Sequence, residues 1–285
     1  MNVAASARGR LALWLFFGLL VVFLYAPIVI LIVFSFNDRS FVSFPWQGFT
    51  LRWYRTFLSN SALLVALRTS GMIAISTAIV TVALAIPASV LLVRRRFFGK
   101  PVVSAVMLSP LVIPLVVFGI ALLILFNTLG VPLSPATVAV GHIVIALPFA
   151  ALTLIPRLER IPVWLEEASR DLGATALTAF RSITLPLLMP AIISSLLISF
   201  VISFDEVVIA SFVAGDEPTF PLYLFSQLRL PRRLPQVIAV AVVVMLLSGV
   251  LVIASEVGRR LSDRRFDREL RAPETLDEQL GEVMA

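Results

Sequence analysis

The residues with the clearest capacity for chemistry are two adjacent carboxylates, Asp205 and Glu206, in an otherwise apolar stretch. A charged side chain at the middle of a lipid-facing helix costs on the order of 2.5–3.5 kcal/mol, so such residues are expected to be functional or paired. On a helix, small and polar side chains here share one narrow stripe, made up of Ser195, Ser199, Ser203, Glu206 and Ala210. Such a stripe predicts either a close helix contact or the lining of a wet path.

Two interpretations of the carboxylates stay open. Near the outer end of a membrane span they could be hydrated, or bridged to an arginine of a neighbouring span. Alternatively, Glu206, with Asp205 second, offers negative charge to a passing cation, because a nearby carboxylate offsets part of the hydration that an ammonium group loses in a narrow path. On that interpretation the substrate path includes Glu206, Asp205, Ser203 and Ser199.

The rest of the chain offers no reaction centre, so no catalytic residue is assigned. The sequence has no cysteine, and its single histidine, His142, cannot form a metal site alone and is expected at the outer membrane interface. No nucleophile–base or metal-ligand cluster is apparent. No GxxxxGK[ST] stretch occurs either, since Gly99-Lys100 lacks the preceding glycine and the following Ser or Thr. We therefore expect a non-catalytic chain that binds no metal, ATP or other cofactor itself.

Composition indicates the class of protein that positions these residues. Hydrophobic residues make up 59% of the 285 residues and charged residues only 14%, against about 25% charged in soluble domains. The chain is therefore predicted to be an all-α integral membrane protein. The net charge of +6 does not indicate nucleic acid, because the arginines stand at the ends of apolar blocks rather than in one patch.

Six apolar blocks are long enough to cross a membrane core of roughly 30 Å, at residues 11–36, 69–93, 102–126, 137–155, 187–213 and 237–257. With the N-terminus inside, most of the 23 lysines and arginines fall in inner segments, so the positive-inside rule predicts that both termini are cytoplasmic. We expect a cytoplasmic N-terminus at residues 1–10, one transmembrane domain at residues 11–260 and a polar cytoplasmic tail at residues 261–285.

The segment at residues 162–186 is a long polar interruption between two of these blocks. Pro162 suits the first turn of a helix, and Gly173 is a plausible helix end. One helix face between them is apolar, formed by Ile161, Trp164, Leu165, Ala168 and Leu172. A second short helix follows, with Leu177, Phe180 and Ile183 as its apolar side. Such an element either lies in the membrane interface or seats in a groove on another protein.

The spacing within this segment carries a more specific signal. Its fixed positions are Glu167, Ala168, Ser169, Gly173, Ile183, Leu185 and Pro186. This pattern resembles the EAA signature of permease subunits in binding-protein-dependent ABC importers, with Ser169 where that family often has alanine. The first outer loop (residues 46–50, 53 and 54), the second inner loop (97 and 99–101) and the fifth span (203–208, 211–213 and 215) resemble the spermidine/putrescine permeases, and the second permease of the pair in particular.

The resemblance implies a type I ABC importer permease fold in the bacterial inner membrane, with a cytoplasmic coupling helix. It implies three kinds of partner: a second permease, a dimer of ATPase subunits that hold ATP and Mg, and an extracytoplasmic substrate-binding protein. The solute would be a polyamine cation, or alternatively another small amine or amino-acid-like solute. Residues expected to face the binding protein or the outer loops are Trp46, Tyr54, Asp216, Glu217 and Tyr223.

A stand-alone, ion-coupled secondary transporter is the main alternative. Proline-broken spans with buried carboxylates also suit ion coupling. That alternative leaves the pattern at residues 167–186 unexplained.

Overall fold

The computed structural model describes residues 7–39, 45–230, 233–254, 256–258 and 260. The predicted tail at 261–285 and the first six residues lie outside these ranges. The described residues are mostly helical, with no strand beyond an isolated bridge between Asn37 and Phe49, so the predicted all-α class is confirmed. The chain divides into two compact units, residues 1–64 with 224–247, and residues 65–223 with 248–285.

Five described helices are long and apolar enough to cross a membrane, and a bent pair of helices would make a sixth. The five are Gly9–Phe34, Ser61–Arg94, Pro135–Arg160, Ala176–Asp205 and Leu234–Gly258. Their positions match five of the six predicted blocks. The sixth block, residues 102–126, is the bent pair.

The first unit contains α1 (Ala7–Phe34) and α2 (Arg52–Leu58). The described side chains of α1 are apolar almost throughout and mostly exposed, as expected for a helix surrounded by lipid. α2 contacts the residues just after α1: the Trp53 indole N–H donates to the Asn37 carbonyl at 2.9 Å, and the hydroxyls of Ser35 and Tyr54 lie 2.6 Å apart.

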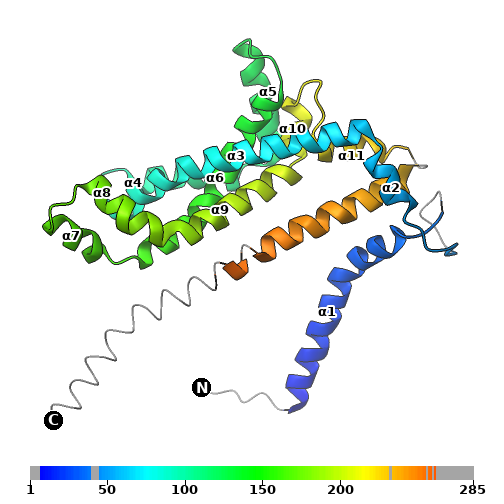
Figure 1. The fold of residues 1–285 in the computed structure, drawn as a ribbon, viewed down its shortest axis with the longest axis horizontal. Coiled ribbons are helices and arrows are strands. Elements are labelled where there is room, and N and C mark those ends of the chain that lie inside the picture. Colours follow the sequence, from blue (N-terminus) through cyan, green and yellow to red (C-terminus); the bar gives the residue numbers. More distant parts are fainter. Residues whose placement is uncertain (1–6, 40–44, 231–232, 255, 259, 261–285) are drawn as a thin grey trace. The chain divides into compact units, whose positions relative to one another are not determined.

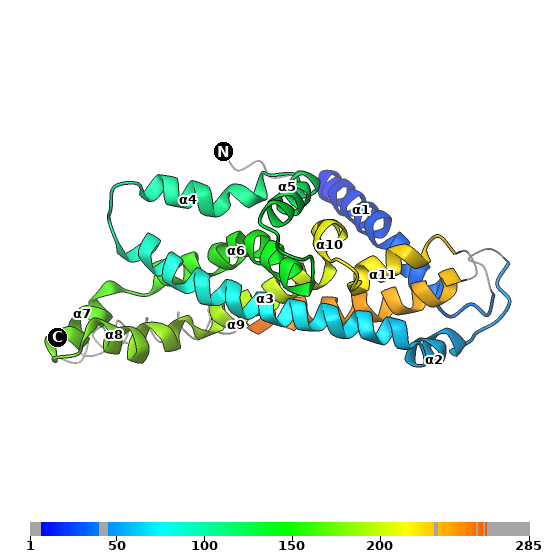
Figure 2. The same ribbon diagram turned by 90° about the horizontal axis from the view of Figure 1, so that it is seen from above.

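The second unit is built on α3 (Ser61–Arg94), α6 (Pro135–Arg160) and α9 (Leu185–Asp205), which run side by side (Figures 1 and 2). Small residues let α6 and α9 approach closely, and the Ser195 hydroxyl donates to the Ala150 carbonyl at 3.3 Å. Buried residues from the three helices form one core, which includes Val82, Ala85, Leu154, Leu158 and Leu188.

The block at residues 102–126, predicted as one span, is sharply bent. It comprises α4 (Lys100–Leu108), a 3₁₀ turn (Ser109–Leu111) and α5 (Leu115–Thr128), and the two parts are bent by 102°. Pro110 and Pro114 provide the physical reason, because proline lacks a backbone N–H and disfavours helical geometry in the residue before it.

The block at residues 187–213 is also broken, where a continuous helix was predicted. α9 ends at Asp205, Glu206 is extended with ψ 121°, and α10 (Val208–Val213) begins a new direction. α11 (Phe220–Gln227) follows. The predicted stripe therefore ends at Ser203, because Glu206 and Ala210 do not belong to α9.

The segment at residues 162–186 forms one end of the second unit in both views, away from α10 (Figures 1 and 2). It contains α7 (Val163–Asp171), α8 (Ala176–Ala179) and a π-helical turn (Phe180–Thr184) that leads into α9. Pro162 lies at the N-cap of α7, immediately before the first turn in which it was predicted. Gly173 has φ +91°, a backbone geometry that favours glycine, and it ends the helix as predicted.

Candidate functional site

The break after α9 is organised around the carboxylate of Glu206, which is only 8% exposed. Its oxygens accept hydrogen bonds from the backbone N–H groups of Val208 at 2.8 Å, Ile209 at 2.9 and 3.0 Å and Ala210 at 3.2 Å. These are the N–H groups that a helix start leaves without internal partners. Glu206 thus supplies hydrogen-bond acceptors to the N–H groups of the first turn of α10 and stabilises the break between α9 and α10.

His142 of α6 contacts both Glu206 and Ser203. Its Nδ1 is 2.8 Å from the Ser203 hydroxyl oxygen and its Nε2 is 3.2 Å from Oε2 of Glu206. In a neutral ring, Nε2–H donates to the carboxylate, which only accepts, and Nδ1 accepts from Ser203. His142 is 1% exposed, so the expectation of an interfacial residue is wrong: its two polar neighbours on the α9–α10 segment make burial favourable.

A cavity of about 450 Å³ opens beside this cluster. Its walls come from the bend between α4 and α5, from α6 and from the end of α9, and they are apolar except for Asp205 and Glu206. The side chain of Asp205 is exposed, and no described residue forms a hydrogen bond or ion pair with it. Of the two carboxylates, Asp205 is therefore the exposed one, whereas Glu206 is hydrogen-bonded by its own chain.

The predicted serine stripe faces α6. Ser195, Ser199 and Ser203 are between 0% and 3% exposed, and none of them lines the cavity. The two predicted alternatives for the stripe were a helix contact and the lining of a wet path, and its geometry here is that of a helix contact.

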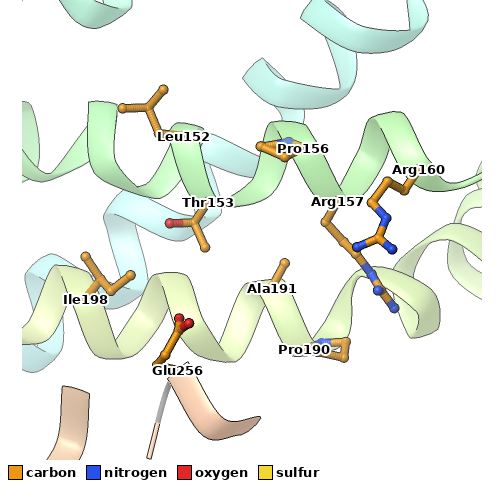
Figure 3. A pocket seen from close by; sticks show the side chains of 9 residues that line it. All are labelled: Leu152, Thr153, Pro156, Arg157, Arg160, Pro190, Ala191, Ile198 and Glu256. Carbon is orange, nitrogen blue, oxygen red and sulfur yellow. The ribbon is translucent and has the colours of Figure 1, made fainter. Parts of the chain in front are cut away.

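A second cavity, of about 340 Å³, lies between α6 and α9 nearer to α7 (Figure 3). The side chains of Arg157 and Arg160 lie at one end of it, and Glu256 approaches from the C-terminal helix. Arg157 is 7% exposed and its Nε–H donates to the Leu187 carbonyl at 2.9 Å. This bond ties the end of α6 to the start of α9, a contact that no sequence pattern marks.

The residues of the EAA-like pattern fall on both sides of a turn. Glu167, Ala168 and Ser169 lie on α7 and Gly173 ends it, while Ile183, Leu185 and Pro186 lie at the entry to α9. The side chain of Glu167 is exposed. Four large apolar side chains of this segment are also exposed, namely Val163 (48%), Trp164 (59%), Leu172 (91%) and Leu177 (58%). The segment thus presents an uncovered apolar surface next to Glu167.

The expected outer-loop residues are divided between the two units. Trp46 and Tyr54 belong to the first, where Trp46 is 42% exposed and Tyr54 contacts Ser35. Asp216, Glu217 and Tyr223 belong to the second, and both carboxylates there are exposed.

Across the described part of the chain, no group of three or more His, Asp or Glu residues could hold a metal ion.

Comparison with known proteins identifies relatives over most of the chain. Residues 82–268 match the model of the family described as binding-protein-dependent transport system inner membrane component. The chain is 39% identical to the spermidine/putrescine transport system permease protein PotC of Escherichia coli K12, covering 87% of this chain and 94% of PotC. It is 37% identical to the putrescine transport system permease protein PotI of the same strain, covering 80% and 84%.

Solved structures share the fold at low sequence identity. A bacterial ABC transporter involved in the import of the acidic polysaccharide alginate matches with a TM-score of 0.68 and 16% identity, over 90% of this chain and 98% of the other. The alginate transporter in complex with an alginate pentasaccharide-bound periplasmic protein matches with a TM-score of 0.62 and 16% identity, over 87% and 95%.

Proposed function

The chain belongs to the family of binding-protein-dependent transport system inner membrane components, and from that membership we propose that it forms half of the path by which an ABC importer carries a polyamine cation. It is a multi-pass inner-membrane permease with the type I fold. Permeases named for spermidine and putrescine are its relatives at 36–39% identity, which supports a polyamine as the solute.

We infer the class of substrate from the position of Asp205. Its exposed carboxylate stands at an apolar cavity of about 450 Å³, within the roughly 300–1,000 Å³ range typical of small-molecule sites. Apolar walls suit the methylene chain of a polyamine, and a carboxylate suits its ammonium group. We assign Asp205 the first contact with the cation, and Glu206 the adjacent negative charge that is anchored in the protein.

The partners follow from the family. The exposed apolar surface of α7 and α8, with Glu167 beside it, supports docking of this segment into one subunit of an ATPase dimer. ATP-driven closure of that dimer would move the segment and rock the permease between inward- and outward-facing states. A second permease completes the path, and an extracytoplasmic binding protein delivers the solute to the outer loops. The distribution of arginines supports cytoplasmic termini.

Another small amine is the second candidate solute, because a single carboxylate at an apolar cavity does not by itself select for chain length. Uptake by a reconstituted complex with its ATPase, second permease and binding protein distinguishes the two candidate solutes. ATP-dependent uptake of labelled putrescine and spermidine is measured in proteoliposomes, with amino acids and monoamines as competitors.

In this assay Asp205→Asn should lower polyamine uptake by roughly tenfold, equivalent to about 1.4 kcal/mol of lost transition-state stabilisation. Glu159→Gln, at an exposed glutamate near the end of α6, is the matched control and should leave uptake unchanged. Unchanged uptake in Asp205→Asn would remove the assigned contact, and effective competition by neutral amino acids would remove the polyamine as the solute.

A further inference from the structure

The contacts of α7 with the rest of its unit include a polar network around Glu166. No residue of α7 is buried, and its large apolar side chains Val163 and Trp164 are 48% and 59% exposed. The side chain of Glu166, in contrast, is only 13% exposed. This helix therefore turns the carboxylate of Glu166, beside the half-buried Leu165, toward its own unit, while Val163 and Trp164 stay exposed.

Glu166 joins two distant parts of the chain. Its Oε1 accepts a hydrogen bond from the Thr184 hydroxyl at 2.6 Å, and the same oxygen lies 3.4 Å from Nε of Arg94. Thr184 is the last residue of the π-helical turn before α9, and Arg94 is the last residue of α3. On its own helix, Arg170 lies 4.0 Å from Oε2 of Glu166.

Arg94 extends the network to a further element. Its Nη2 donates to the carbonyl of Ile161 at 2.9 Å, and Ile161 is the fully buried C-cap of α6. The side chain of Arg94 is 11% exposed. One guanidinium and one carboxylate thus connect the ends of α3 and α6, the helix α7, and the entry to α9.

We propose that Glu166 is a positioning residue that transmits movement of α7 into α3 and α9 during transport. The inference rests on the proposed function, in which α7 contacts the ATPase. The Thr184 hydroxyl donates a short hydrogen bond to the carboxylate, and the ion pair with Arg94 at 3.4 Å attracts α7 to the end of α3. Both side chains of this ion pair are mostly shielded from water, which weakens screening. Such a junction is directional, because it joins α7 to defined atoms of Arg94 and Thr184, so a movement of α7 is expected to displace the ends of α3 and α9. Glu166 and Glu167 are adjacent but differ in role, since Glu167 is exposed and faces outward.

The test measures uptake and ATP hydrolysis on the same proteoliposomes containing the complete importer. Glu166→Ala removes the contacts with Thr184, Arg94 and Arg170, whereas Glu166→Gln keeps an oxygen for Thr184 and loses the charge. In Glu166→Ala, ATP hydrolysis should persist while polyamine uptake per ATP falls roughly fivefold or more, the lower end of typical coupling between sites. Glu166→Gln should fall between this variant and the unaltered chain, and Glu159→Gln should match the unaltered chain.

A second readout does not depend on the solute. Because the chain has no cysteine, Ser211→Cys on α10 gives this chain a single, exposed labelling site, on a helix that lies away from α7 (Figures 1 and 2). An environment-sensitive fluorophore there should respond to ATP in the otherwise unaltered complex. In Glu166→Ala the response should disappear although ATP is still hydrolysed, and Glu166→Gln, which keeps an oxygen for Thr184, should retain part of it.

The outcomes separate this inference from the proposed function. If Glu166→Ala lowers the amount of assembled complex but leaves uptake per ATP and the fluorescence response of the assembled fraction unchanged, Glu166 is only structural and the inference fails. If the unaltered complex itself takes up no polyamine, the proposed solute fails instead, and the fluorescence response still decides the role of Glu166.

Discussion

Nε2 of His142 lies 3.2 Å from Oε2 of Glu206, and both side chains are buried at the point where the fifth span breaks. The two residues are 64 positions apart in the sequence. The imidazole thereby adds a side-chain donor to a carboxylate that already accepts three backbone N–H groups of α10. This contact links α6 to the break after α9, where Asp205 is the last helical residue.

Replacing His142 should destabilise this junction. His142→Leu removes the donor to Glu206 and the partner of Ser203, and leaving a buried polar group unsatisfied costs about 1–3 kcal/mol. The melting temperature of the purified complex in detergent should fall, and uptake should fall with it because Asp205 is displaced. His142→Gln retains a donor and should lose less. Equal losses in the two variants would show that ring packing, rather than the hydrogen bond, is what matters.

Glu206→Gln should act mainly on stability. The carboxylate accepts from several N–H groups, whereas an amide places its NH₂ group against one of them, so a donor meets a donor. We expect a lower melting temperature, while uptake per assembled complex falls less than in Asp205→Asn. A Glu206→Gln complex of normal stability with abolished uptake would instead make Glu206 the primary contact of the cation.

Much of this architecture could be predicted from the sequence because its signals are local. In the structure, α7 lies between Pro162 and Gly173, the two residues that the sequence predicts as its start and end. The apolar blocks likewise predict the positions of the spans. Hydropathy does not give the direction of a span: it does not predict that the third block turns by 102° at Pro110 and Pro114, or that Glu206 caps a new helix within the fifth. The contacts of His142 could not be predicted, since its partners lie 61 and 64 positions away and only the packing of α6 on α9 brings them together.

Gly173 should be intolerant of larger residues. Its φ of +91° is unfavourable for any residue with a Cβ, at about 1–2 kcal/mol or more for a β-branched one. Gly173→Val should therefore extend or distort the end of α7 and weaken binding of the ATPase subunits. Co-purification of the ATPase with the tagged permease measures this. Gly71→Val, within α3 where a Cβ meets no atom within 4 Å, is the control. Normal ATPase binding by Gly173→Val would show that the turn is not needed for docking.

The chain on its own should not transport. It has no ATP-binding motif and, as the proposal has it, supplies only half of a path, so neither an energy source nor a closed route is present in the isolated subunit. Proteoliposomes that contain only this chain should show no polyamine accumulation under an imposed proton or sodium gradient. Adding the second permease, the ATPase, the binding protein and internal or external ATP, as the orientation of the complex requires, should start uptake. Gradient-driven accumulation by the isolated chain would establish an ion-coupled transporter in place of an ABC importer subunit.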